Sequence, residues 1–182
     1  DMRLPGIEVR PIRTMAGDSG FAEVFLDEVR IPRSALLGEV DEGWTVATRT
    51  LSNERAGVAT LYLHLRRKLD RLLEEAAQPG PDGRRPTDSA LVRDALAACY
   101  TDVRVLELLA KRMLGAMIAG RMPGPEGSVI KLAWGATDQA LSNTAVEVLG
   151  LPALTGSWGW NLLGSRSLTI AGGTSEVNRN IV

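Results

Sequence analysis

Cysteine and histidine are almost absent from this chain. Its 182 residues include one cysteine, Cys99, and one histidine, His64. A single cysteine excludes an intramolecular disulfide, and one thiol with one imidazole are too few ligands for a zinc site built on sulfur and nitrogen. We therefore expect neither a disulfide framework nor a metal site, and we expect Cys99 to be a buried thiol.

The chain also has no excess of one charge and few aromatic residues. The 21 Lys and Arg residues against 22 Asp and Glu residues give a formal net charge of −1, which argues against the positive field of a nucleic-acid-binding protein. Aromatic residues make up only 4% of the chain, and this share suits aliphatic helix packing better than a β-sandwich. The hydrophobic share of 45% predicts a globular domain with a real core.

Long apolar runs are absent as well. None approaches the ~20 residues that span a bilayer, and the first residues show no basic segment followed by an apolar one, as a signal peptide would. We therefore expect a cytoplasmic chain without a membrane span. The start reads as a loop that enters a strand, and the last residues carry no helix cap, so we expect both ends to continue in a longer chain.

Strand patterns are confined to the first part of the sequence. Residues 7–12 alternate apolar and polar side chains, and residues 21–32 are rich in β-branched and aromatic residues. The Gly-Asp-Ser-Gly sequence at 17–20 supplies turn chemistry between them. Two strands cannot bury a core alone, so residues 1–40 are predicted to be an incomplete β domain.

Helical periodicity follows from about residue 41. Apolar residues recur at three- and four-residue intervals in long segments separated by Pro-Gly breaks. The predicted helices are 42–78, 88–121, 126–149, a segment at 156–164 that is either irregular or one short helix, and a last helix from near Thr174. At ~1.5 Å per residue the first would reach roughly 50 Å. The predicted fold class is mainly α, with an up-down antiparallel helical bundle over residues 41–182.

Six motifs then occur in a fixed order along the chain. They are Pro5–Val9, Phe21–Pro32, Leu36–Glu39, Glu42–Trp44, Asn53–Arg55 and Ala171–Ile181. Together they resemble the acyl-CoA dehydrogenase family of flavoproteins. The resemblance covers essentially the whole chain and corresponds to the end of the family's middle β domain followed by its C-terminal helical bundle. It implies an oxidoreductase of fatty acid metabolism that uses FAD.

The chemistry implied by this resemblance is α,β-dehydrogenation of an acyl thioester. A carboxylate removes the α-proton while the β-hydrogen leaves as a hydride to flavin N5. Such a site needs a base whose pKa is raised in a dry environment. It also needs hydrogen-bond donors at the thioester oxygen, where negative charge develops.

The resemblance implies Glu54 as the base. Many family members carry the base directly before the Gly-Thr of the last motif, where this chain has Gly172. A minority place a Glu on the first long bundle helix, directly before an Arg, and Glu54-Arg55 matches that arrangement. Arg55 would then help to hold the base or the CoA. Taken without the resemblance, Glu54 reads as an ordinary solvated helix charge.

The last motif is expected to contact both thioester and cofactor. The backbone N–H of Gly172 is implied to bind the thioester carbonyl, with Gly173 on the substrate side. The missing carboxylate at Gly172 leaves volume for a branched or bulky acyl group. Thr174 and Glu176 fall where the family contacts the flavin ribose and adenine side; simple N-capping by Thr174 is the alternative and can coexist with that contact.

A departure from the family pattern follows the first long helix. Family members often carry an Arg-x-x-Phe-Gly segment there, which reaches the flavin pyrophosphate of a neighbouring subunit. This chain has Gly-Pro-Asp-Gly-Arg-Arg-Pro over 80–86, so Arg84 and Arg85 are the candidates to replace that arginine, without the aromatic residue.

The resemblance also implies partners. The substrate would be an acyl-CoA or an acyl-carrier thioester, and the electrons would pass to an electron-transfer flavoprotein or another acceptor. Assembly as a dimer of dimers, either a homotetramer or a hetero-oligomer, is expected. Two other interpretations stay open: a non-catalytic partner subunit of a hetero-oligomeric dehydrogenase, and a flavin oxidase or monooxygenase of the same fold.

Overall fold

The computed structural model describes residues 1–121 and 124–182, and within these it leaves the side chains of residues 51–56 undescribed. The chain forms two compact units, Asp1–Ser52 and Asn53–Val182. No described helix has both the length and the apolar character needed to cross a membrane.

The first unit contains a two-stranded antiparallel hairpin. β1 (Ile7–Ile12) pairs with β2 (Phe21–Leu26), with Ile7 opposite Leu26. The second strand is shorter than the predicted run, because Glu28 adopts a positive φ of 46° that ends the extended backbone. Every residue of β2 is exposed, so the hairpin buries no core of its own, as expected of two strands alone.

The predicted helix over 42–78 is divided in the structure. α1 (Gly43–Gly57) and α2 (Tyr62–Ala76) flank a 3₁₀ turn at Val58–Thr60. The prediction of one uninterrupted α-helix is therefore wrong at this point. The Thr60 hydroxyl donates to the carbonyl oxygen of Gly57 at 2.9 Å, and β-branched residues lower helix propensity; both favour the tighter turn.

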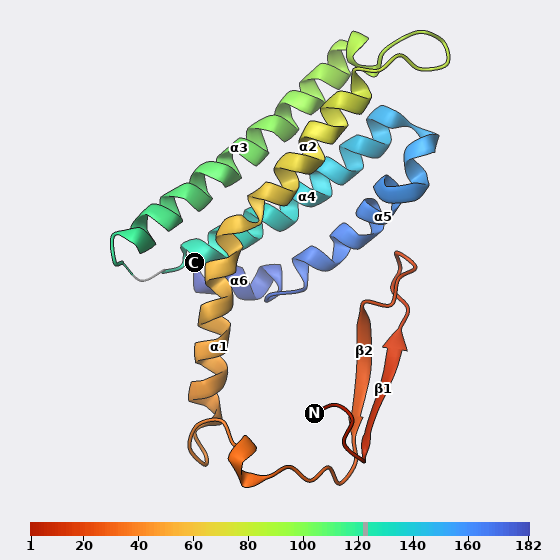
Figure 1. Cartoon of the computed structure of the whole chain (residues 1–182). Coiled ribbons are helices and arrows are strands. Elements are labelled where there is room, and N and C mark those ends of the chain that lie inside the picture. Colours follow the sequence, from red (N-terminus) through yellow and green to blue (C-terminus); the bar gives the residue numbers. More distant parts are fainter. Residues whose placement is uncertain (122–123) are drawn as a thin grey trace. The chain divides into compact units, whose positions relative to one another are not determined.

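The remaining helices follow the predicted segments. They are α3 (Ala90–Ile118), α4 (Glu126–Leu149), α5 (Gly156–Gly164) and α6 (Ser175–Ile181). α4 has the predicted bounds and ends at Gly150, whose φ of +71° suits a residue without Cβ. The segment at 156–164 is a helix. The prediction of a mainly helical bundle after a short β segment is confirmed (Figure 1).

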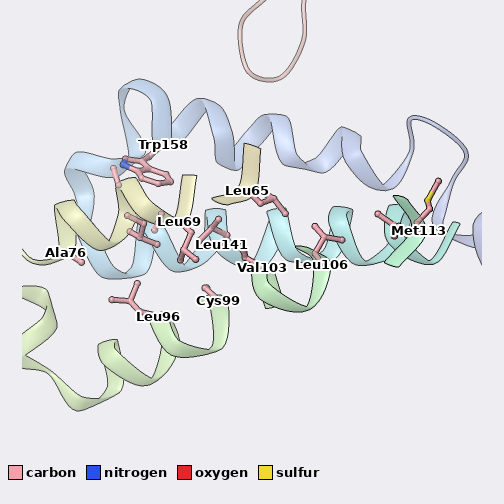
Figure 2. Close-up of a cluster of buried hydrophobic side chains, with 14 residues drawn as sticks. Leu65, Leu69, Ala76, Leu96, Cys99, Val103, Leu106, Met113, Leu141 and Trp158 are labelled. Atoms are coloured by element: carbon pink, nitrogen blue, oxygen red, sulfur yellow. The ribbon is translucent and has the colours of Figure 1, made fainter. Parts of the chain in front are cut away.

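The core of the bundle lies between α2, α3 and α4, with α5 packed on α4. Figure 2 shows the inward side chains of these helices gathered in one cluster. Its fully buried members are aliphatic, and burying each stabilises the fold by about 1.5–3 kcal/mol: they include Leu65, Leu69, Leu72, Val103, Leu106, Ile130 and Leu141. Cys99 is buried as predicted, and Trp158 covers the cluster from α5.

One buried ion pair crosses this core. The Lys68 ammonium of α2 lies 2.8 Å from Asp138 Oδ1 and 2.7 Å from Ser142 Oγ, both on α4. The Ser142 hydroxyl in turn donates to the Asp138 carbonyl oxygen at 2.7 Å. Burial of a charge is costly unless it is paired and hydrogen-bonded, and here each polar group has a partner. The contact fixes α2 against α4.

Candidate functional site

The turn that precedes α6 is built on two glycines in left-handed conformations. Gly172 has φ +67° and Gly173 has φ +86°, a region that disfavours residues with a Cβ. A Cβ on Gly173 would lie 2.9 Å from the Asn178 side-chain amide nitrogen, whereas a Cβ on Gly172 would approach Lys131 Cε no closer than 3.9 Å. The space beside Gly172 is therefore open, while that beside Gly173 is filled.

Asn178 holds this turn from within α6. Its side-chain amide nitrogen donates to the carbonyl oxygens of Gly173 at 2.8 Å and Thr174 at 3.0 Å, with the Gly172 carbonyl oxygen at 3.4 Å. Asn178 is 5% exposed. The side chain thus replaces the hydrogen bonds to water that these backbone carbonyls would otherwise make.

Lys131 holds the same turn from the bundle. Its ammonium donates to the Gly173 carbonyl oxygen at 2.5 Å across 42 residues of sequence. Lys131 is 5% exposed. Burial lowers the pKa of its ammonium, and the negative charge of Glu176 partly opposes that shift. The turn is therefore fixed to α4 by one charged hydrogen bond.

Thr174 and Glu176 lie at the start of α6, as predicted. The Thr174 hydroxyl oxygen accepts the Val177 backbone N–H at 3.2 Å, so Thr174 caps the helix. The Glu176 side chain is exposed, and its pKa is lowered by a hydrogen bond from its own backbone N–H and by the Thr174 hydroxyl. Glu176 therefore presents an ionised acceptor beside the glycine turn at neutral pH.

Arg84 and Arg85 occupy the loop between α2 and α3. They line a hollow of about 630 Å³ together with Gly80, Asp82 and Asp88. Both arginines are exposed, and in the part of the chain that the structure describes neither guanidinium forms an ion pair. Exposed guanidinium groups of this kind suit a phosphate ligand.

The structure does not bring these arginines to the glycine turn within one chain. Figure 1 shows the loop between α2 and α3 at one end of the bundle and α6 at the other. α3 alone has 29 residues, which corresponds to roughly 43 Å at the usual helical rise. The two groups of predicted cofactor residues could therefore meet one ligand only across two copies of the bundle.

The predicted base lies outside the described side chains. Glu54 and its neighbour Arg55 belong to α1, within the group of residues 51–56. Their assigned roles remain predictions.

Sequence reasoning missed Lys131 and Asn178 as parts of the site. Both side chains donate hydrogen bonds to backbone carbonyl oxygens. Every residue has such a carbonyl, so a sequence motif does not reveal this kind of contact. The one available signal was a lysine in the otherwise apolar run Val129–Ala133 of α4. A cation there is unexpected unless it has a buried acceptor.

The residues present fit parts of an FAD molecule. Arg84 and Arg85 offer charge for its phosphates, and the Glu176 carboxylate offers an acceptor for hydroxyl or amino groups. The glycine turn exposes backbone at a helix start, where the N–H groups favour anionic or partly anionic atoms. Glu176 of one chain and Arg84 and Arg85 of a second copy would hold the adenine and phosphate side of the cofactor, and the glycine turn would be left to the thioester.

A family model and two relatives name the same family. The model for "Acyl-CoA dehydrogenase, C-terminal domain" matches residues 41–182. The chain is 34% identical to acyl-CoA dehydrogenase IpdE1 of Mycolicibacterium smegmatis, over 98% of this chain and 45% of that protein. It is 37% identical to acyl-CoA dehydrogenase FadE34 of Mycobacterium tuberculosis, over 97% of this chain and 24% of that protein.

Solved structures show the same architecture. A variant of the steroid ACAD Tcur3481-Tcur3483 matches with a TM-score of 0.87 and 25% identity, over 100% of this chain and 49% of that one. The chain thus spans less than half the length of these three relatives.

Proposed function

Because the chain belongs to the acyl-CoA dehydrogenase family, we propose that it supplies part of the active site of an FAD-dependent enzyme that dehydrogenates an acyl thioester between Cα and Cβ. The observation that carries this proposal is the match of the family model over residues 41–182. The glycine turn before α6, held by Lys131 and Asn178, lends it physical support.

Glu54 is the proposed base. Its carboxylate takes the α-proton, and the electron pair left on Cα forms the new double bond as the β-hydrogen departs. FAD, when bound, supplies the hydride acceptor at N5. The assignment rests on the Glu54-Arg55 sequence of α1 and on the absence of a carboxylate at Gly172. Arg55 is proposed to hold the base or the CoA.

The Gly172 backbone N–H is the proposed donor to the thioester carbonyl oxygen. A donor stabilises developing charge best when its position is fixed before the reaction. The carbonyl of the next residue, Gly173, accepts hydrogen bonds from Lys131 and Asn178, so the turn on the substrate side has little freedom. Thr174, Glu176, Arg84 and Arg85 are the proposed contacts to FAD.

A branched or bulky acyl group is the proposed substrate class. The open space beside Gly172 is where many family members would carry a carboxylate, and a Cβ at this position meets no atom closer than 3.9 Å. The similarity to a steroid ACAD supports the same choice. Turnover of unbranched acyl chains alone would contradict it.

The proposed partners follow from the family. The thioester would be carried by CoA or by a carrier protein, and an electron-transfer flavoprotein or another acceptor would reoxidise the flavin. Assembly as a dimer of dimers, homo- or hetero-oligomeric, would let Arg84 and Arg85 serve the site of a second chain. The isolated 182-residue chain is expected to bind little FAD, and micromolar binding measured by equilibrium dialysis would contradict that.

The test uses the full-length protein with bound FAD, mixed anaerobically with acyl-CoA thioesters. Bleaching of the flavin absorbance is expected for the wild type and for the control Glu74→Gln, a change at an exposed glutamate of α2. Glu54→Gln is expected to abolish bleaching while FAD content stays constant. Unchanged bleaching in Glu54→Gln would overturn the assignment of the base.

One observation favours a second candidate, a non-catalytic partner subunit: the residue at the position of the family's usual base is Gly172. A full-length protein that holds FAD yet is not bleached by any acyl-CoA thioester would support that role. Prompt reaction of the reduced flavin with oxygen would instead indicate an oxidase.

A further inference from the structure

Two lysines lie inside the bundle, and they differ in what balances their charge. Lys68 has a carboxylate partner, because its ammonium lies 2.8 Å from Asp138 Oδ1. Lys131 is 5% exposed, yet among the described residues it forms no ion pair. Its ammonium donates instead to the neutral Gly173 carbonyl oxygen, at 2.5 Å. Since a buried charge is stabilised by an opposite charge, Lys131 lacks the partner that Lys68 has.

Glu176 does not supply that partner. Its carboxylate is exposed and forms its ion pair with Arg179, at 3.5 Å. Burial lowers the pKa of the Lys131 ammonium, and the charge of Glu176 opposes this shift only in part. The cost of burying this ammonium is therefore not offset by a carboxylate in the part of the chain that the structure describes. Charged groups kept in such unfavourable surroundings occur at functional sites.

The position of Lys131 indicates what its charge can act on. Apart from residues 171–173 themselves, the one described atom within 4 Å of a Cβ placed on Gly172 is Lys131 Cε, at 3.9 Å. The lysine therefore borders the open space beside Gly172, where the acyl thioester is proposed to lie. When the α-proton leaves, negative charge develops on the thioester oxygen in that region.

A hydrogen bond to the turn does not by itself require a lysine. The Gly173 carbonyl oxygen also accepts a hydrogen bond from the neutral side-chain amide of Asn178, at 2.8 Å. The carbonyl would thus keep a partner without Lys131. What the lysine adds is a fixed positive charge. Charges interact more strongly where water is excluded, because the effective dielectric constant is lower there.

We propose that the Lys131 ammonium is the counter-charge for the negative charge that develops on the thioester oxygen. The Gly172 N–H donates the hydrogen bond to this oxygen, and Lys131 supplies a positive charge from behind the turn. Lys131 is thus a positioning residue that acts through the turn and by its charge, and the α-proton itself passes to Glu54. The inference rests on the proposed function, because it requires the thioester oxygen at Gly172.

Infrared difference spectroscopy of the full-length protein with bound FAD tests this inference without turnover. The probe is crotonyl-CoA labelled with carbon-13 at the thioester carbonyl. It already has the double bond between Cα and Cβ, so the oxidised protein does not dehydrogenate it at that bond. A positive charge and an N–H donor draw electrons toward the carbonyl oxygen, which weakens the C=O bond. The wild type is therefore expected to shift the C=O stretch below its frequency in free crotonyl-CoA.

Three variants at Lys131 separate charge from hydrogen bonding. Lys131→Arg keeps the charge and is expected to keep most of the downshift. Lys131→Gln keeps a neutral donor and Lys131→Met keeps no donor; both are expected to lose at least about half of the downshift. Arg67→Met removes an exposed cation of α2 and serves as the matched control. Circular dichroism and FAD content show whether each variant is folded, and the milder change to glutamine decides if Lys131→Met is not.

The wild-type spectrum separates failure of this inference from failure of the proposed function. A downshift in the wild type that Lys131→Gln retains would show that a neutral donor suffices, and would overturn the inference alone. A loss in Lys131→Arg as large as that in Lys131→Gln would also overturn it, because charge would then not be the property that matters. If the wild type does not bind crotonyl-CoA or does not shift its carbonyl band, both the proposed function and the inference are wrong.

Discussion

The ammonium of Lys131 lies 2.5 Å from the carbonyl oxygen of Gly173, and this contact joins the turn before α6 to helix α4. The two residues are far apart in sequence, yet both belong to the second unit of the chain. Asn178 donates to the same carbonyl oxygen at 2.8 Å. The position of the Gly172 N–H, the proposed thioester donor, therefore depends on side chains from α4 and α6.

Lys131→Met should loosen this turn. Hydrogen bonds from charged donors contribute about 1.5–3 kcal/mol, but methionine keeps most of the apolar contacts of the stem, so a loss of about 1–2 kcal/mol in the free energy of unfolding is expected. Amide hydrogen exchange at Gly172 and Gly173 should accelerate more than exchange in the α3 core. Equal protection of the turn in the variant and the wild type would show that Asn178 suffices.

The two glycines of the turn should differ in their tolerance of alanine. Both have positive φ, which costs a Cβ-bearing residue about 1–2 kcal/mol. Gly173→Ala also forces its Cβ to 2.9 Å from Asn178 Nδ2, whereas Gly172→Ala meets only ordinary contacts. Urea unfolding should therefore rank Gly173→Ala as the more damaging change, and the reverse order would contradict the geometry of the turn.

Replacing only one partner of the Lys68–Asp138 ion pair between α2 and α4 should lower the free energy of unfolding considerably. Lys68→Met leaves Asp138 mostly buried without its cation, and such a loss typically costs about 3–5 kcal/mol. The double change Lys68→Met/Asp138→Leu removes the unpaired charge as well and should cost less than the single change. Arg66→Met, at a half-exposed pair with Asp70 and a longer contact of 3.8 Å with Glu107, should cost about 1 kcal/mol or less. Thermal unfolding of the three variants measures this order.

Glu107 should contribute to the loss of folding stability as the pH falls. The hydrogen bond from Lys111 lowers the pKa of this carboxyl below its usual 4.5, with a further contribution from Arg104, while partial burial opposes the shift. The unfolded chain then binds the proton more readily than the folded one below pH 4.5, so stability is lost as the pH falls. Glu107→Gln should flatten this decline, and Glu74→Gln should leave it unchanged. A decline of equal steepness in Glu107→Gln and the wild type would argue against that role.

Much of the bundle could be predicted because the breaks between helices have strong local signals. α4 has the predicted bounds because Pro125 precedes it and Gly150 with Pro152 follows it. The 3₁₀ turn at Val58–Thr60 was not predicted, because apolar spacing is nearly the same in a 3₁₀ turn and an α-helix. The feature that favours the 3₁₀ turn is the hydrogen bond that the Thr60 hydroxyl donates to the Gly57 carbonyl oxygen.

Some residues of the candidate site could likewise be predicted from the sequence, and others could not. Thr174 could be placed at the start of the last helix from the Gly-Gly-Thr-Ser sequence, because capping is a local event. Lys131 could not, because its partner is a backbone carbonyl 42 residues away and only the folded chain brings them together. The separation of Arg84 and Arg85 from the glycine turn also follows from the length of α3, not from any motif.

The central claim is that the Glu54 carboxylate removes the α-proton of the acyl thioester. Its most direct measurement is the washout of deuterium from an α-deuterated acyl-CoA by the full-length FAD protein under anaerobic conditions, followed by mass spectrometry. A missing general base typically costs about 10²–10⁴-fold, so Glu54→Gln should slow the washout by that factor, while Glu74→Gln should match the wild type. Equal washout rates in Glu54→Gln and the wild type would contradict the account.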